Sequence, residues 1–221
     1  MLARGFWSLL LALAWSLSHA QQLNTNFDLL VAVRSGNLAR AASLLDQGAS
    51  SNSRNRLGDT PLNTAARNGQ IEMVRLLLAH QADIDLANLA RVTPLMSAAY
   101  GGHEAVVREL LAHRADLART DRVNKTAMVY AAGNGNAACV RALLDAGIDA
   151  NQRYADGSTA LMWAAAYGKL DSVALLLERG ADAQVRDDRG MTALAIAGEQ
   201  KQDAAVQVLT AATQAKARGP Q

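Results

Sequence analysis

The sequence predicts an all-α repeat solenoid, that is, a stack of helix-turn-helix pairs with projecting β-hairpin turns. Three recurring features predict it. A threonine recurs every 33 residues, at Thr60, Thr93, Thr126, Thr159 and Thr192. A glycine follows nine residues after each of the first four threonines, and a leucine pair begins at Leu77, Leu110, Leu143 and Leu176. A fixed period of this length indicates small units that bury their apolar faces only against one another.

The first helix of each unit begins at the threonine. A threonine hydroxyl caps a helix by accepting a hydrogen bond from a free backbone N–H. Pro61 and Pro94 follow at the position where a first-turn proline is tolerated. The glycine should end this helix, because glycine enters the left-handed backbone region without strain.

The second helix of each unit carries the leucine pair. A valine lies three residues before each pair, as Val107 does before Leu110, and together they form one apolar stripe. The polar segment that follows is suited to an extended hairpin with a tight turn. Gly58, Gly157 and Gly190 occupy the turn, whereas Arg91 and Asn124 replace glycine in the two middle hairpins. Arginine tolerates the left-handed region poorly, so we expect the hairpin at Arg91 to bend differently.

The pattern resembles the ankyrin repeat, whose signature is Thr-Pro-Leu-His-x-Ala. The segment Thr60-Pro61-Leu62-Asn63-Thr64-Ala65 matches it except at the histidine. The resemblance implies two antiparallel helices and a hairpin in each unit. The histidine is replaced throughout, so we expect its hydrogen bonds between units to be lost. Its replacements are Asn63, Met96, Val129, Met162 and Ala195.

The register divides the chain into a signal segment, one repeat domain and a tail. Residues 21–214 form the predicted ankyrin-repeat domain, with full units at 59–91, 92–124, 125–157 and 158–190. Residues 26–58 and 191–214 keep the register incompletely, and we interpret them as the N-terminal and C-terminal capping units. Residues 215–221 have no periodicity and are predicted to be a disordered tail.

Residues 1–20 have the pattern of a secretory signal peptide. Arg4 supplies a positive charge, an apolar run extends from Phe6 to Leu17, and Ser18-His19-Ala20 fits a cleavage site. The alternative is an uncleaved anchor. Cleavage near Gln21 would leave a periplasmic or secreted protein with no later segment that inserts into a membrane. The single cysteine excludes an intramolecular disulfide, and this composition favours a bacterial periplasm.

The sequence offers little for catalysis, cofactors or nucleic acid. The formal net charge is only +2, so a clustered basic footprint is not expected. His80 and His113 occupy equivalent places in adjacent units, too far apart for one metal ion, and His103 follows the glycine where ankyrin repeats often have a structural histidine. We therefore expect a protein that is not an enzyme, with no metal site and no cofactor.

The aromatic residues give the best indication of a binding site. Tyr and Trp, with Arg, dominate the energetics of protein interfaces. In an ankyrin-like fold Tyr130 and Trp163 would face the concave groove, and Tyr100 and Tyr167 would lie on the same side. The alternative is that these rings only pack on neighbouring first helices. The predicted partner-binding residues are Arg67, Tyr100, Arg122, Tyr130, Arg153, Tyr154, Trp163 and Tyr167.

These observations favour a monomeric, exported scaffold that binds another protein through its concave face and hairpin tips. It would act as an adaptor, an inhibitor or an immunity-type protein. Similar exported bacterial ankyrins suggest an alternative, a helper of a peroxide-detoxifying enzyme such as catalase. A second alternative is a small-molecule binder or an enzyme that uses the aromatic groove.

Overall fold

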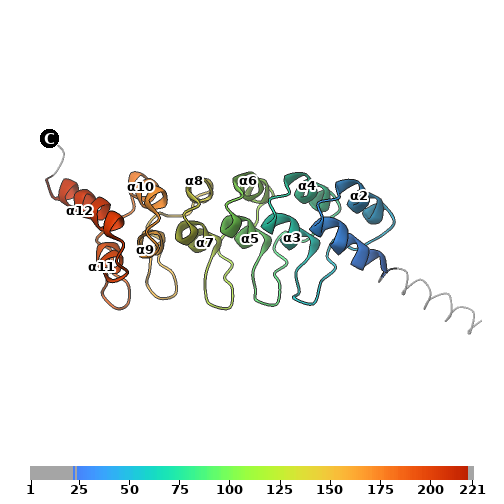
Figure 1. Ribbon diagram of the computed structural model, residues 1–221, viewed down its shortest axis with the longest axis horizontal. Coiled ribbons are helices and arrows are strands. Elements are labelled where there is room, and N and C mark those ends of the chain that lie inside the picture. Colours follow the sequence, from blue (N-terminus) through green and yellow to red (C-terminus); the bar gives the residue numbers. More distant parts are fainter. Residues whose placement is uncertain (1–21, 23, 219–221) are drawn as a thin grey trace, which may run out of the picture.

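The protein is a single row of helix pairs (Figure 1). The computed structural model describes residues 22 and 24–218. The predicted signal peptide lies outside the described residues. No helix in the described part is long and apolar enough to cross a membrane. No strand occurs between residues 24 and 218, so the predicted hairpins are turns without a regular ladder.

Each pair consists of an inner and an outer helix. A helix over 24–34 and α2 (Leu38–Asp46) form the first pair. The next pairs are α3 (Pro61–Arg67) with α4 (Ile71–Ala79), α5 (Pro94–Gly101) with α6 (Glu104–Ala112), α7 (Ala127–Asn134) with α8 (Ala137–Asp145), α9 (Ala160–Ala166) with α10 (Leu170–Glu178), and α11 (Ala193–Glu199) with α12 (Asp203–Arg218).

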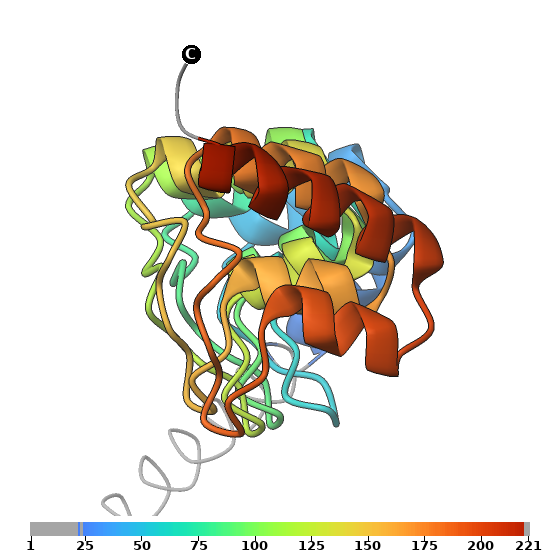
Figure 2. The same cartoon turned by 90° about the vertical axis from the view of Figure 1, so that its left-hand side faces the viewer.

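The inner helices α3, α5, α7, α9 and α11 pack side by side, and the outer helices form a second row against them. The loops between units project from the stack on the side of the inner helices (Figures 1 and 2). The inner helices and the loops together form the face on which the candidate site lies.

The threonine caps form as predicted. Each hydroxyl accepts a hydrogen bond from the backbone N–H three residues later, at distances between 3.0 Å for Thr60 and 3.4 Å for Thr126 and Thr159. Gly102 and Gly135 end α5 and α7 in the left-handed region. The 33-residue period therefore corresponds to the helix starts and stops of the units.

The replacement of the histidine has different consequences in different units. The Asn63 side chain donates to the carbonyl of Val92 in the next unit at 3.2 Å, so a hydrogen bond between units is retained there, contrary to our expectation. Asn63 also accepts from the Thr60 backbone, which completes a capping box. Met96 and Met162 are instead buried in the apolar core.

One continuous core extends from Leu29 to Leu209. The first leucine of each pair is fully buried, and the alanine pairs of the inner helices let neighbouring helices approach closely. The hydrophobic core is thus built by the outer-helix leucines and inner-helix alanines.

The hairpin at Arg91 does not bend differently from its neighbours. Arg91 adopts a left-handed φ of 63°, close to the 76° of Gly58. Its N–H donates to the Asn88 carbonyl at 2.9 Å, as that of Gly58 does to Asn55. The side-chain amide oxygen of Asn88 accepts from the N–H groups of Ala90 and Val92 and fixes the turn. These hydrogen bonds hold Arg91 in the same turn geometry as Gly58, although arginine disfavours the left-handed region.

Replacing Arg91 with glycine should therefore stabilise the protein. Left-handed backbone costs a non-glycine residue about 1–2 kcal/mol, and the greater freedom of glycine in the unfolded chain offsets part of that. We expect the free energy of unfolding in urea to rise by about 0.5–1 kcal/mol. The control Ala90→Gly, where φ is not positive, should lower it. A lower stability for Arg91→Gly would contradict this interpretation.

The C-terminal end differs from the sequence interpretation. Helix α12 packs against α10 and α11 and continues to Arg218. Residues 215–218, which were predicted to belong to a disordered tail, are therefore helical, whereas residues 219–221 lie outside the described part. The helix continues because no glycine or proline interrupts the segment before Gly219.

Candidate protein-interaction face

Two tyrosines of adjacent inner helices meet on the inner face. The rings of Tyr100 on α5 and Tyr130 on α7 lie edge to face, with centroids 5.8 Å apart. Tyr100 is 60% exposed. Tyr130 is half-buried, and its hydroxyl donates to a carboxylate oxygen of Asp121 at 2.5 Å. Burial and this hydrogen bond raise the pKa of Tyr130, so the phenol stays neutral.

A second aromatic pair is formed by Trp163 on α9 and Tyr167 directly after its last residue. The rings of Trp163 and Tyr167 are nearly parallel, at 20°, with centroids 6.2 Å apart. The indole N–H of Trp163 donates to Ser158 Oγ at 2.8 Å, and Tyr167 is 53% exposed. The ammonium of Lys125 lies 4.7 Å from the Trp163 ring centroid and 5.9 Å from that of Tyr130. Lys125 thus connects the two pairs by cation–π contacts.

We call Tyr100, Tyr130, Trp163 and Tyr167, with Lys125 between the middle two, the aromatic row. The structure brings together these four predicted residues from α5, α7 and α9. They differ in exposure: Tyr130 and Trp163 are anchored to the loops by hydrogen bonds, whereas Tyr100 and Tyr167 present most of their surface to solvent. Contact with a partner would therefore involve mainly Tyr100 and Tyr167.

Arg67 lies next to this row on α3 and holds a buried carboxylate. Two of its guanidinium nitrogens contact the oxygens of Asp59 at 3.0 and 3.3 Å, and the Asn88 amide donates to Asp59 at 2.7 Å. Asp59 is 2% exposed. Burial acts to raise the pKa of Asp59, but the hydrogen bonds from Asn88 and Arg67 outweigh it and hold the pKa below its usual value. Arg67 therefore has a structural role, with its outer side still open to solvent.

The lowered pKa of Asp59 predicts an acid-sensitive contribution to stability. A carboxylate with a depressed folded-state pKa stabilises the fold above its unfolded pKa of about 4, and the contribution disappears as the pH falls through the folded value. Asp59→Asn should therefore be less stable than wild type at neutral pH, and the difference should shrink below about pH 4. Urea unfolding between pH 7 and pH 2 tests this. A difference that stays constant over that range would contradict it.

The two predicted tip arginines have different environments. The side chain of Arg122 is exposed and has no hydrogen bond or ion pair within the described part of the chain. Arg153 donates to the carbonyl of Arg186 at 2.7 Å and contacts Asp188 at 3.2 Å, both in the next loop. Arg122 remains available to a partner, whereas Arg153 connects two loops.

Tyr154 does not form part of the exposed face. Its ring packs against the core, and its hydroxyl is buried. Burial raises the pKa of Tyr154 to about 12. Tyr154 lies at the base of the turn and not at its tip, because it takes the position of Asn55, Asn88 and Asp121, whose side chains point inward. Contact between Tyr154 and a partner stays a prediction.

Sequence analysis missed apolar residues at the loop tips. Leu57, Leu89 and Val123 are all exposed. Their loops are adjacent, since the N–H of Leu89 donates to the Leu57 carbonyl and that of Arg122 donates to the Ala90 carbonyl. Leu57 and Val123 occupy the same place in the 33-residue period, which could have revealed them, whereas Leu89 lies one position earlier in its unit, where Ala90 takes that place. They extend the apolar surface from the inner helices to the tips.

No group of His, Cys, Asp or Glu between residues 24 and 218 could hold a metal ion. Cys139 is buried, and burial raises the pKa of its thiol to about 11, so it is a poor nucleophile at neutral pH. His103 has the expected structural contact, with Nε2 2.9 Å from the Arg67 carbonyl of the preceding unit.

Three features together identify the architecture: the helix pairs, the threonine caps, and the aromatic row on the inner face. The family model for "Ankyrin repeats (3 copies)" matches residues 29–121, 86–154 and 128–218. The chain belongs to the ankyrin-repeat family. Ankyrin repeats are typically non-enzymatic modules that bind other proteins, and this chain is accordingly a protein–protein interaction scaffold. Comparison with curated proteins gives no significant match.

Proposed function

We propose that this ankyrin-repeat protein is exported and binds a partner protein through the aromatic row and the loop tips. One observation carries the proposal: Tyr100 and Tyr167 are more than half exposed although both are large rings, Tyr100 within an inner helix and Tyr167 at the C-terminal end of another. Exposed tyrosines on a preformed surface contribute strongly to binding, because little side-chain freedom is lost when a partner docks.

The extent of the surface favours a protein as the partner. The aromatic row spans α5, α7 and α9, and the exposed apolar tips of three successive loops continue it. Charged side chains of both signs occur on the inner helices and loops, among them the partly exposed Arg67, the exposed Arg122 and the exposed Asp188. An apolar centre with a polar rim is the usual composition of a protein interface.

The pattern of residues 1–20 supports a role outside the cytoplasm. We therefore infer that the partner is another periplasmic or secreted protein, and that the scaffold acts as its adaptor or inhibitor, including an immunity-type role. A monomeric stack would suit such a one-to-one complex.

Affinity capture from the extracytoplasmic fraction of the source cells tests the proposal. We expect the wild-type chain to capture a defined protein, and Tyr100→Ala with Tyr167→Ala to weaken its binding by about 2 kcal/mol or more, the scale of interface hot spots. The matched control is Leu38→Ala with Leu170→Ala, two exposed leucines at the start of outer helices. Equal binding by the tyrosine variant, with unchanged melting temperature, would refute the proposal.

A further inference from the structure

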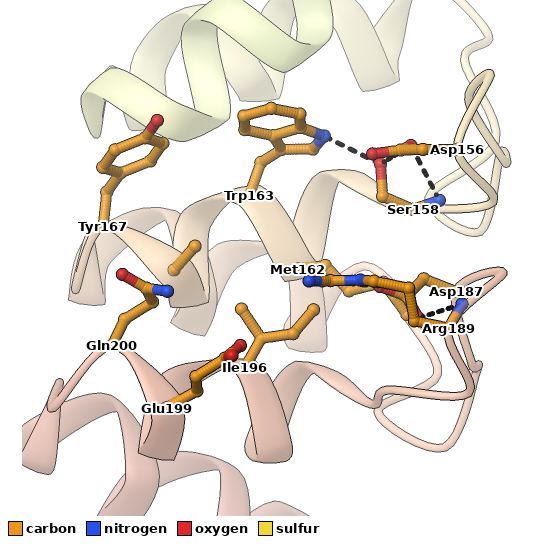
Figure 3. Close-up of a pocket in the computed structure, with 11 residues that line it drawn as sticks. Asp156, Ser158, Met162, Trp163, Tyr167, Asp187, Arg189, Ile196, Glu199 and Gln200 are labelled. Carbon is orange, nitrogen blue, oxygen red and sulfur yellow. Dashed lines mark hydrogen bonds and ion pairs between the residues drawn. The ribbon is translucent and has the colours of Figure 1, made fainter.

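A small pocket lies at the end of the aromatic row, between α9 and α11 (Figure 3). Trp163 and Tyr167 line one side, Ile196 and Glu199 line the other, and the loop that carries Arg189 closes one end. Its volume is about 240 Å³. Pockets for drug-sized ligands are larger, at about 300–1,000 Å³, so this one suits a single side chain.

The aromatic wall of the pocket is fixed before any ligand arrives. Ser158 accepts the Trp163 indole N–H at 2.8 Å and itself donates to Asp156 at 2.5 Å. Lys125 contacts the Trp163 ring from a second hollow, in which the indole is also a wall. The Trp163 ring therefore already contacts one cation, the Lys125 ammonium, and the indole lies between that ammonium and the pocket beside Tyr167.

The charges in the pocket favour a cationic ligand. Asp156, Asp187 and Glu199 line it together with one arginine, Arg189. Arg189 is committed to Asp187, at 2.8 and 3.0 Å. Glu199 is near enough to Arg189 for their charges to attract, but it forms no hydrogen bond or close ion pair within the described residues. A positive group entering the pocket would meet two ring surfaces and a carboxylate that no hydrogen bond holds.

We propose that this pocket binds an arginine side chain presented by the partner protein, an inference that rests on the proposed function. The guanidinium would lie against the Trp163 and Tyr167 rings and pair with Glu199. A flat guanidinium stacks on aromatic faces and pairs with a carboxylate in the same plane, which the compact ammonium of lysine does less well. Tyr167 is exposed, lines the pocket and also belongs to the aromatic row, so the arginine would extend from the surface already docked on that row.

Fluorescence of Trp163 tests the pocket without the partner. The variant Trp7→Phe with Trp15→Phe leaves Trp163 as the only indole of the full chain. The probe is acetyl-Gly-Arg-Gly-amide, and the control is the same peptide with citrulline, which has the shape of arginine without its charge. We expect a saturable change with the arginine peptide and none with the citrulline peptide. Glu199→Gln should lower the affinity for the arginine peptide about fivefold, as expected when a partly exposed charge pair is removed. Glu178→Gln, at the exposed end of α10, should have no effect.

An equal response to both peptides, no response, or no effect of Glu199→Gln would overturn the pocket assignment. The proposed function is tested separately, because Tyr100 is not part of the pocket. If Tyr100→Ala weakens partner capture while the arginine peptide fails to bind, the scaffold function stands and the arginine site is wrong. If the peptide binds selectively and Glu199→Gln also weakens partner capture about fivefold, both inferences are supported.

Discussion

Replacing Leu110 with alanine should lower the free energy of unfolding by about 2–5 kcal/mol, the range for truncation of a buried leucine. Leu110 lies on α6, in a central unit of the stack. Its side chain is fully buried and belongs to the continuous core. Each repeat is stabilised only by its neighbours, so a cavity in a central unit weakens two interfaces at once. Urea unfolding followed by circular dichroism measures the loss.

The control for this prediction is Leu111→Ala. Leu111 is only partly buried, so its truncation should cost clearly less. Neither variant should change the partner affinity of the molecules that remain folded, because neither side chain reaches the inner face. A loss below about 1 kcal/mol for Leu110→Ala would contradict the assignment of Leu110 to a tightly packed core.

Replacing Asp121 with alanine should cost about 2–4 kcal/mol, as expected when several hydrogen bonds to one buried charged acceptor are lost. One carboxylate oxygen of Asp121 accepts from the N–H groups of Val123 and Lys125 at 2.9 and 2.8 Å, and the other accepts from the Tyr130 hydroxyl. Asp121 is almost completely buried, so water cannot replace these bonds fully.

The matched variant for Asp121→Ala is Tyr130→Phe, which removes one of the three donors and leaves the turn intact. It should cost about 1 kcal/mol. Thermal unfolding of both variants gives the comparison. Equal losses of stability for Tyr130→Phe and Asp121→Ala would contradict this prediction. They would mean that the Tyr130 hydroxyl, and not the two backbone hydrogen bonds, holds the turn.

The architecture could be predicted because it depends on local residues that repeat. Threonine caps, glycine stops and leucine pairs act within one unit, and their effects do not require knowledge of distant contacts. The register also gave Tyr130 and Trp163 the same repeat position, and the resemblance to ankyrin repeats implied that this position faces the inner groove.

Side-chain partners across units could not be predicted in this way. Asn63 retains a contact with Val92 because its amide reaches the next loop, and Arg91 adopts a left-handed conformation because Asn88 fixes the turn around it. Tyr154 was assigned to the surface from its place near a loop tip, although its ring fills space against the core. The contact of Asn63 and the packing of Tyr154 depend on the fit between neighbouring parts of the stack, whereas the Arg91 turn depends on hydrogen bonds of Asn88 within the same loop.

Hydroxyl-radical footprinting of the chain, alone and with its captured partner, tests the central claim most directly. We expect Tyr100, Tyr167 and the tip residue Leu89 to become protected from oxidation, while Leu38 and Leu170 on the outer helices stay equally reactive. Protection of Leu38 and Leu170, with Tyr100 and Tyr167 unchanged, would place the partner on the outer helices and contradict the account.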